Sequence, residues 1–276
     1  MEIIVCGSGV GRFSGSRAGS GWLIGSKSAY TLFDCGPGIA LRISDNGIPF
    51  EDIKAIFISH LHFDHVQGIG ELLTQYEAAD KEPPTIYGPP GVKNYVDTAV
   101  KWSNFQFENR ETEPQNIVES EEVKSGIQID FNRYSVSAVS VPHSPKIEAR
   151  SYKITNGTQS VVYSGDTPYV PEILIPFTKG CDVLIHEAHS LEALNLHAEH
   201  GSIDRAARIK QVFPSSHSRV TEAAKIAQSS GVKKLVLSHL LPTETEDTLL
   251  SEISEIPDFF YDVEIVIPND GSMIQI

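Results

Sequence analysis

The sequence contains little cysteine, and this excludes two common kinds of small-domain framework. Three cysteines occur in the 276 residues, and they lie far apart, at Cys6, Cys35 and Cys181. Three dispersed thiols predict neither a disulfide framework nor a cysteine-rich zinc site. We expect them to be buried and reduced in a cytoplasmic protein, because disulfides persist mainly in oxidising compartments.

Basic residues are also scarce. The chain has 22 Lys and Arg residues against 36 Asp and Glu residues, which gives a net charge of −14. It therefore lacks the bulk basic surface with which proteins bind long polynucleotides tightly. This does not exclude a nucleic-acid substrate, because bound divalent metals would add positive charge that a residue count omits.

Long apolar runs are missing as well. No stretch reaches the length that a membrane-spanning helix needs. The opening residues Met1-Glu2-Ile3-Ile4-Val5 carry neither the charged region nor the long apolar region of a signal peptide. We expect a soluble, intracellular protein without a membrane partner.

Short apolar runs rich in β-branched residues recur along the chain and have the length of strands. Gly, Pro, Asn or Asp bounds each run, as is typical of strands joined by turns. Their clustering in both halves predicts an α/β fold with two sheets and helices outside them. No change of composition marks a linker, so we expect one domain over residues 1–276. The expected strands are residues 3–6, 21–24, 30–34, 55–59, 136–141, 160–164, 182–185, 234–238 and 263–267, and the expected helices are residues 68–81, 90–103, 221–230 and 244–255.

A glycine-rich segment, Gly7-Ser8-Gly9-Val10-Gly11-Arg12, follows the first expected strand. It is similar to a dinucleotide-binding loop, but Arg12 stands where that motif requires its third glycine. We therefore expect a tight strand-to-strand turn, in which glycine adopts conformations closed to other residues.

The run Ser59-His60-Leu61-His62-Phe63-Asp64-His65 carries the strongest chemical signal. Four side chains able to bind metal fall within six residues, between an expected strand and an expected helix. His60 and His62 can point to one side of such a loop, while Asp64 and His65 turn to the other at the helix start. One segment could thus serve two adjacent metal ions; a polar loop with ordinarily hydrogen-bonded histidines explains the spacing less well.

Other side chains able to bind metal stand directly after apolar runs. They are His143, Asp166, His186 and His239. Sites in α/β proteins gather at the carboxyl ends of strands, so these residues can converge on one cleft. Any one of them alone would more often be structural, but together with the first run they form a set.

This set resembles the ligand series of the metallo-β-lactamase-like superfamily. The resemblance spans nearly the whole chain and implies a four-layer αββα sandwich with a binuclear metal site at one sheet edge. It also implies that His60, His62 and His143 bind one ion, that Asp64, His65 and His239 bind the other, and that Asp166 bridges them. A shell of imidazoles and carboxylates without thiolate suits two zinc ions first, with manganese or iron as alternatives.

Within the superfamily the chain looks most like the ribonuclease Z branch. His186-Glu187-Ala188 and Ser216-His217-Ser218 resemble two short motifs of that branch, and the resemblance implies that His217 donates a proton to the leaving group. Glu187 and His186 would support the site. Three features depart from the branch. His189 follows the first motif, and we expect it, like His197 and His200, at most to line the cleft mouth and not to bind metal. Asp166 follows His143 by 23 positions, where many ribonuclease Z enzymes carry a long tRNA-binding arm, and residues 190–216 form an extra segment with His197 and His200.

We therefore expect a metal-dependent hydrolase that uses a metal-bridged hydroxide. The favoured activity is that of a phosphodiesterase on a small or short phosphodiester, with tRNA doubtful because of the missing arm. Hydrolysis of another ester, such as a sulfate ester, lactone or thioester, is the alternative that the ligand set leaves open. A binding module and a di-iron redox protein fit less well, because the ligand series is complete and we expect no flavin domain within these 276 residues. The resemblance also implies a homodimer.

Overall fold

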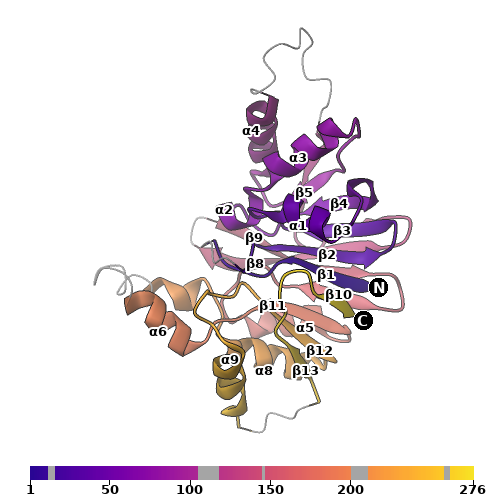
Figure 1. Cartoon of the computed structure of the whole chain (residues 1–276). Coiled ribbons are helices and arrows are strands. Elements are labelled where there is room, and N and C mark those ends of the chain that lie inside the picture. Colours follow the sequence, from indigo (N-terminus) through magenta and orange to yellow (C-terminus); the bar gives the residue numbers. More distant parts are fainter. Residues whose placement is uncertain (12–15, 105–117, 145–146, 200–210, 258–261) are drawn as a thin grey trace.

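Two mixed sheets form the centre of the protein (Figure 1). The computed structural model describes residues 1–11, 16–104, 118–144, 147–199, 211–257 and 262–276, and the structural statements below concern these residues.

The first sheet has seven strands in the order β14-β1-β2-β3-β4-β5-β6. Pairing is antiparallel from β14 to β3 and parallel from β3 to β6. Every residue of β3 is buried, as expected for a strand covered on both faces. The strands are β1 (Glu2–Gly7), β2 (Gly21–Ser26), β3 (Ala29–Phe33), β4 (Ile53–Phe57), β5 (Ile86–Gly88), β6 (Ser120–Glu122) and β14 (Met273–Gln275).

The second sheet repeats this mixed pattern with seven strands in the order β13-β12-β11-β10-β9-β8-β7. Pairing is parallel from β13 to β10 and antiparallel from β10 to β7. The strands are β7 (Gln128–Asp130), β8 (Ser135–Ser144), β9 (Ile147–Thr155), β10 (Ser160–Tyr163), β11 (Val183–Glu187), β12 (Lys234–Ser238) and β13 (Glu264–Val266).

Helices cover the outer faces of both sheets. In Figure 1, α3 and α4 lie at the top of the molecule, and α8 and α9 lie at its bottom. Buried residues of α8 recur at helical spacing, at Val220, Ala223, Ala224 and Ala227, and pack in one cluster with the second sheet. The helices are α1 (Ile39–Asp45), α2 (Phe63–Val66), α3 (Ile69–Ala78), α4 (Val92–Asn104), α5 (Pro171–Thr178), α6 (Leu191–Glu199), α8 (Val220–Ser230) and α9 (Glu246–Ser254).

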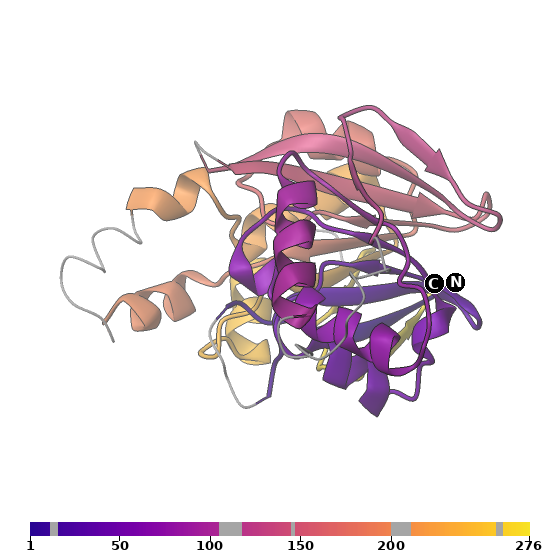
Figure 2. The same ribbon diagram turned by 90° about the horizontal axis from the view of Figure 1, so that it is seen from above.

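A shared core lies between the sheets and joins the two halves. Trp22, Phe33 and Phe57 of the first sheet pack in one cluster with Tyr152 and Tyr163 of the second. With helices on both outer faces, this arrangement is the four-layer αββα sandwich that the sequence predicts. Strands β1 and β14 pair directly, so the two termini lie side by side, while α6 projects from one end of the sandwich (Figure 2).

The expected strands and helices are found within a few residues of their predicted bounds, but one prediction about the N-terminal glycines is wrong. They do not form a tight turn, because β1 ends at Gly7 and β2 begins only at Gly21. Instead, Gly9 pairs with Leu240, and the Ser8 carbonyl accepts a hydrogen bond from the Leu240 amide (2.9 Å). The segment thus reaches across to the second sheet.

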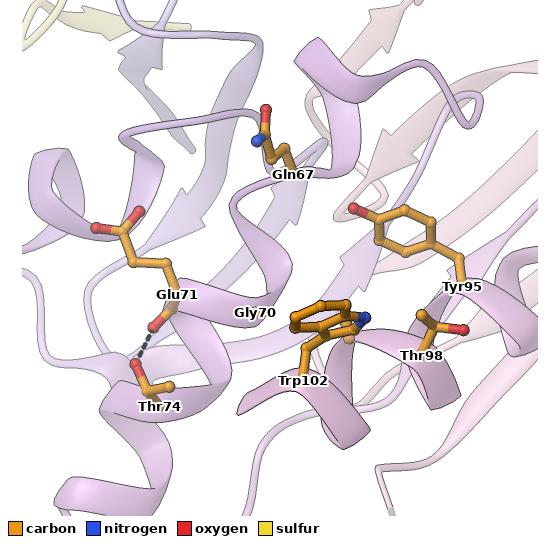
Figure 3. A pocket seen from close by; sticks show the side chains of 8 residues that line it. Gln67, Gly70, Glu71, Thr74, Tyr95, Thr98 and Trp102 are labelled. Atoms are coloured by element: carbon orange, nitrogen blue, oxygen red, sulfur yellow. Dashed lines mark hydrogen bonds between the residues drawn. The ribbon is translucent and has the colours of Figure 1, made fainter. Parts of the chain in front are cut away.

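No helix in the described part of the chain combines the length and apolarity needed to cross a bilayer. A cavity of about 610 Å³ lies on the outer helical layer between α3 and α4. Figure 3 shows Trp102, 71% exposed, and Tyr95 on the α4 side of this cavity, facing α3. It is lined by Gln67, Gly70, Glu71, Thr74, Tyr95, Thr98, Ala99 and Trp102, and none of these is a predicted site residue.

Candidate metal centre

The run from Ser59 to His65 leaves β4 and turns into the short helix α2. Two backbone hydrogen bonds hold this turn: the Ser20 amide donates to the Asp64 carbonyl (3.0 Å), and the Cys35 amide donates to the His65 carbonyl (2.8 Å). The approach is close enough to require glycine at position 36, where a Cβ atom would lie 2.0 Å from the Asp64 carbonyl oxygen. The run is therefore fixed by the ends of β2 and β3.

The other predicted ligands come from the ends of second-sheet strands. His143 lies at the end of β8, Asp166 follows β10, and His239 follows β12. His239 adopts a positive φ of 55°, which is rare for residues other than glycine and turns its side chain away from the course of the strand. The strand ends thus bring residues distant in sequence beside His60–His65.

One cluster consists of His60, His62 and His143 with Asp166. The Nδ1 atom of His62 lies 2.9 Å from Nε2 of His60 and 2.9 Å from Nε2 of His143. The Oδ2 atom of Asp166 lies 3.8 Å from Nε2 of His60. Three imidazole nitrogens and a carboxylate oxygen therefore face one point.

A second cluster consists of Asp64, His65 and His239. Nε2 of His239 lies 3.2 Å from an oxygen of Asp64 and 3.2 Å from an oxygen of Asp166. Nε2 of His65 lies 3.4 Å from Asp166 and, although buried, has no hydrogen-bond partner among the described residues. Asp166 thus borders both clusters.

The protonation states of the histidines and aspartates in the two clusters favour the binding of metal cations. Burial lowers the pKa of His60 and of His143, and it lowers the pKa of His62 to about 4, so these rings are neutral with free lone pairs. Burial would raise the pKa of Asp64 and Asp166, but neighbouring histidines outweigh it and lower both pKa values, so the carboxylates are ionised. Neutral imidazoles and ionised carboxylates are the forms that bind metal.

His65 differs in its pKa. Burial would lower the pKa of this ring, but the Asp166 and Asp34 carboxylates outweigh it and raise the pKa well above the usual value. The same negative charges would stabilise a divalent cation at Nε2 in place of the proton. The unpartnered Nε2 atom and the converging lone pairs show that the residues present fit metal ions.

Oxygen atoms behind three of the rings fix their orientation. Asp34 accepts a hydrogen bond from Nδ1 of His65 (2.6 Å), and the Ser216 carbonyl accepts one from Nδ1 of His143 (2.8 Å). The Ser59 hydroxyl contacts Nδ1 of His60 at 3.1 Å. Such partners orient ligand rings toward a metal.

Glu187 and His217 form a hydrogen-bonded pair beside the clusters. Nδ1 of His217 lies 2.8 Å from Oε2 of Glu187, whose other oxygen accepts a hydrogen bond from the Thr167 amide. Burial would lower the pKa of His217, but the Glu187 carboxylate outweighs it and raises the pKa. The His217 side chain is 23% exposed and stacks on the His239 ring at 5.3 Å. It therefore lies between the second cluster and solvent.

Of the other histidines singled out from the sequence, His186 lies near the clusters but does not face them, and His197 and His200 have no described side chain. His186 is buried, and its Nδ1 donates to the Glu187 carbonyl (2.7 Å), so the described hydrogen bond of the ring goes to the backbone and to neither cluster. His200 lies outside the described residues, and the side chain of His197 is likewise undescribed.

Sequence reasoning missed two residues at this site. His189 was expected at most to line the cleft mouth, yet it is buried and lies within reach of Glu187, His217 and His239. Glu244 contacts it from the segment that precedes α9. Its place directly after the His186-Glu187-Ala188 motif was the signal that could have identified His189.

Comparisons with known proteins agree with this geometry. The family profile described as "Anti-Pycsar protein Apyc1" matches residues 1–218. Ribonuclease Z of Mycobacterium sp. (strain KMS) is 30% identical over 251 residues, which cover 88% of this chain and 85% of that protein.

Solved structures share the fold at lower identity. The metallo-β-lactamase fold protein YhfI from Bacillus subtilis aligns with a TM-score of 0.74 and 23% identity over 99% of both chains. The short form of human tRNase Z aligns with a TM-score of 0.70 and 21% identity over 100% of this chain and 99% of that chain. The resemblance drawn from the sequence is confirmed: the chain belongs to the family described as anti-Pycsar protein Apyc1, and it is a metal-dependent hydrolase of the metallo-β-lactamase fold related to ribonuclease Z.

Proposed function

We propose that the protein is a phosphodiesterase that hydrolyses a small or short phosphodiester at a binuclear metal centre. The observation that carries this proposal is the pair of ligand clusters bordered by Asp166, with the Glu187–His217 pair directly beside it. Two cations held by one carboxylate suit a reaction in which charge develops on both the attacking and the leaving oxygen.

The ligand assignment is part of the proposal. His60, His62 and His143 would hold one ion, Asp64, His65 and His239 the other, and Asp166 both. Nitrogen and oxygen donors without thiolate favour zinc, with manganese or iron as alternatives. When bound, the ions would supply Lewis acidity and an activated water.

Asp64 is suited to act on that water as well as to bind metal. Its Oδ2 atom accepts a hydrogen bond from the Gly11 amide (2.9 Å), which fixes the carboxylate in one orientation. An ionised carboxylate held in this way can orient the attacking water and accept its proton. The N-terminal glycine segment thus contributes to the site through its backbone.

His217 is suited to protonate the leaving oxygen. Glu187 keeps a proton on Nδ1 and raises the pKa of the ring, so His217 can carry a second proton on Nε2 and donate it to the leaving oxygen. The alkoxide of an unactivated phosphodiester is a poor leaving group, so it needs such a proton. An ester with a better leaving group would need it less, and this favours a phosphodiester over the alternative esters.

The short interval between His143 and Asp166 supports a small substrate. The end of β8, the strand β9 and the strand β10 occupy it, and β8 pairs with β9 up to Ser144 and Ile147. Two antiparallel pairings leave little chain for a long tRNA-binding arm. The net charge of −14 points the same way.

An activity panel tests the proposal. We expect zinc-loaded protein to hydrolyse bis(p-nitrophenyl) phosphate and at least one small phosphodiester, such as a nucleoside cyclic monophosphate, faster than sulfate esters, lactones, thioesters or a tRNA precursor. Asp64→Ala should abolish this hydrolysis with the fold intact, whereas Asp97→Asn, on the exposed face of α4, should retain it. Equal turnover in Asp64→Ala would contradict the site, and faster turnover of another ester would replace the proposed substrate class.

The acid role of His217 has its own test. We expect His217→Ala to slow hydrolysis of diesters with poor leaving groups by about 10²–10⁴-fold, and to affect p-nitrophenyl diesters much less. Glu187→Gln should show the same dependence on leaving group in weaker form. Equal losses for both kinds of substrate would remove the acid role and leave His217 a binding residue.

The oligomeric state is a smaller proposal. The resemblance to ribonuclease Z implies a homodimer. Light scattering of the purified protein measures this directly, and a monomeric mass at micromolar concentration would contradict it.

A further inference from the structure

The ring of His239 is held differently from those of His60, His65 and His143. Behind each of these three rings stands an oxygen atom, from Ser59, Asp34 or Ser216. Behind His239 stands another imidazole: its Nδ1 lies 3.3 Å from Nε2 of His189.

Glu187 does not take this place. Its nearest oxygen lies 3.9 Å from Nδ1 of His239, which is too far for a hydrogen bond. Its described hydrogen bonds go to Thr167 and His217. His189 is therefore the hydrogen-bond partner of His239 on the side away from the cluster.

The backbone conformation of His239 and the direction of its ring both call for a partner at Nδ1, the place that His189 takes. The positive φ of His239 is an unfavourable backbone conformation for a residue with a side chain, so contacts with the surrounding residues must help to maintain it. Nε2 of His239 faces the Asp64 and Asp166 carboxylates, and a metal ion bound there would leave the ring proton on Nδ1, which then needs a hydrogen-bond partner.

His189 is itself held firmly. Its amide donates to the Ser218 carbonyl (3.2 Å), and its carbonyl accepts from the Val220 amide (2.9 Å). Oε1 of Glu244 lies 3.3 Å from its Nδ1, an electrostatic contact that falls short of hydrogen-bond alignment. Glu244 is anchored by the amides of Ser190 (2.9 Å) and Leu241 (2.5 Å).

We propose that His189, backed by Glu244, is a positioning residue that orients His239 as a ligand of the second metal ion. Glu244 contacts the ring on its Nδ1 side, while Nε2 faces Nδ1 of His239 at 3.3 Å and Oε2 of Glu187 at 3.5 Å. The relay runs Glu244, His189, His239. This inference rests on the metal centre proposed above, and it adds two residues that belong to neither of the two ligand sets assigned there.

Zinc titration of the metal-free protein, in competition with a chromophoric chelator, tests the relay. His189→Phe keeps an aromatic ring but removes both nitrogens, and we expect it to raise one of the two zinc dissociation constants about 10–100-fold. His189→Gln restores an acceptor for Nδ1 of His239 and should recover most of that loss. Glu244→Gln should weaken the same zinc equivalent about tenfold. Tyr76→Phe is the control, because it removes a hydrogen bond to the Phe50 carbonyl (2.7 Å) in the outer helical layer and should leave both constants unchanged.

Three results would overturn the relay. One is unchanged zinc constants in His189→Phe with a loss of thermal stability like that of Tyr76→Phe, which would make His189 merely structural. Another is a third zinc equivalent in the wild type that His189→Phe removes, which would make His189 a ligand. The third applies if His189→Phe does not fold: unchanged zinc dissociation constants in Glu244→Gln would then overturn the relay. The titration needs no substrate, so it is independent of the phosphodiesterase assignment; a wild type that fails to bind two equivalents would contradict the metal centre itself.

Discussion

Replacing Asp34 by asparagine perturbs the candidate metal centre without touching a proposed ligand. Asp34 is fully buried at the end of β3 and has a positive φ of 59°. Its Oδ2 atom accepts hydrogen bonds from Nδ1 of His65 (2.6 Å) and from the hydroxyls of Tyr163 (2.5 Å) and Ser59 (2.7 Å). Asparagine has nearly the same shape and also tolerates positive φ, so the backbone conformation is preserved.

The expected magnitude follows from the proton on His65. Oδ1 of Asp34 accepts a hydrogen bond from the Ser59 backbone amide (2.6 Å), which would keep the oxygen of the new side chain at that place. In Asp34→Asn the amide nitrogen would then stand where Oδ2 accepts, so Nδ1 of His65 would lose its acceptor. The ring would then favour its proton on Nε2, the atom that faces Asp166 at 3.4 Å and that a metal ion needs free. Loss of such a carboxylate behind a ligand ring weakens metal binding about 10–100-fold, which corresponds to about 1.4–2.8 kcal/mol.

The assay is competitive zinc titration of metal-free wild type, Asp34→Asn and Tyr163→Phe. Tyr163→Phe removes one donor to Asp34 but leaves the His65 contact intact, so it should cost about 1 kcal/mol of unfolding free energy and leave zinc affinity unchanged. Zinc dissociation constants of Asp34→Asn within about twofold of the wild type would refute the reasoning, since the expected change is at least about tenfold. Equal weakening in both variants would show that loss of local packing, and not the His65 proton, is responsible.

Two further predictions concern the metal ions and the packing of the ligand loop. Removal of metal by a chelator should lower the midpoint of thermal unfolding, and added zinc should restore it. The reason is that an ion present at about 100 times its dissociation constant stabilises the folded state by about 2.7 kcal/mol. A calorimetric midpoint that neither treatment changes would contradict a metal centre in the native protein. Gly36→Ala should lower the stability by several kcal/mol and weaken zinc binding, because its Cβ would lie 2.0 Å from the Asp64 carbonyl oxygen. Gly70→Ala, whose Cβ would meet nothing within 4 Å, should be neutral or stabilise α3 by up to about 1 kcal/mol. Equal melting curves for the two variants would refute the packing argument.

Elements whose apolar residues run together were predictable from the sequence, and β9 shows why others were not. Its residues Ala149–Tyr152 are all buried, yet the set includes Arg150 and Ser151, which break the apolar run. Arg150 is accommodated by the carbonyls of Val123 and Ala149 and by Glu148. Polar partners that arrive from other segments make such burial possible, and no local pattern reveals them.

The sequence by itself determined which residues could bind metal, because the His60–His65 spacing and the residues that end apolar runs are local features. It also implied the αββα sandwich through the superfamily resemblance. The tertiary structure decided which atoms face one another: Asp34 behind His65, and His189 with Glu244 behind His239. The Asp34–His65 and His189–His239 contacts join residues 31 and 50 positions apart, and they depend on which strand ends meet at the edge of the two sheets. A hydrogen bond needs a distance and a direction, and only the assembled strands supply both.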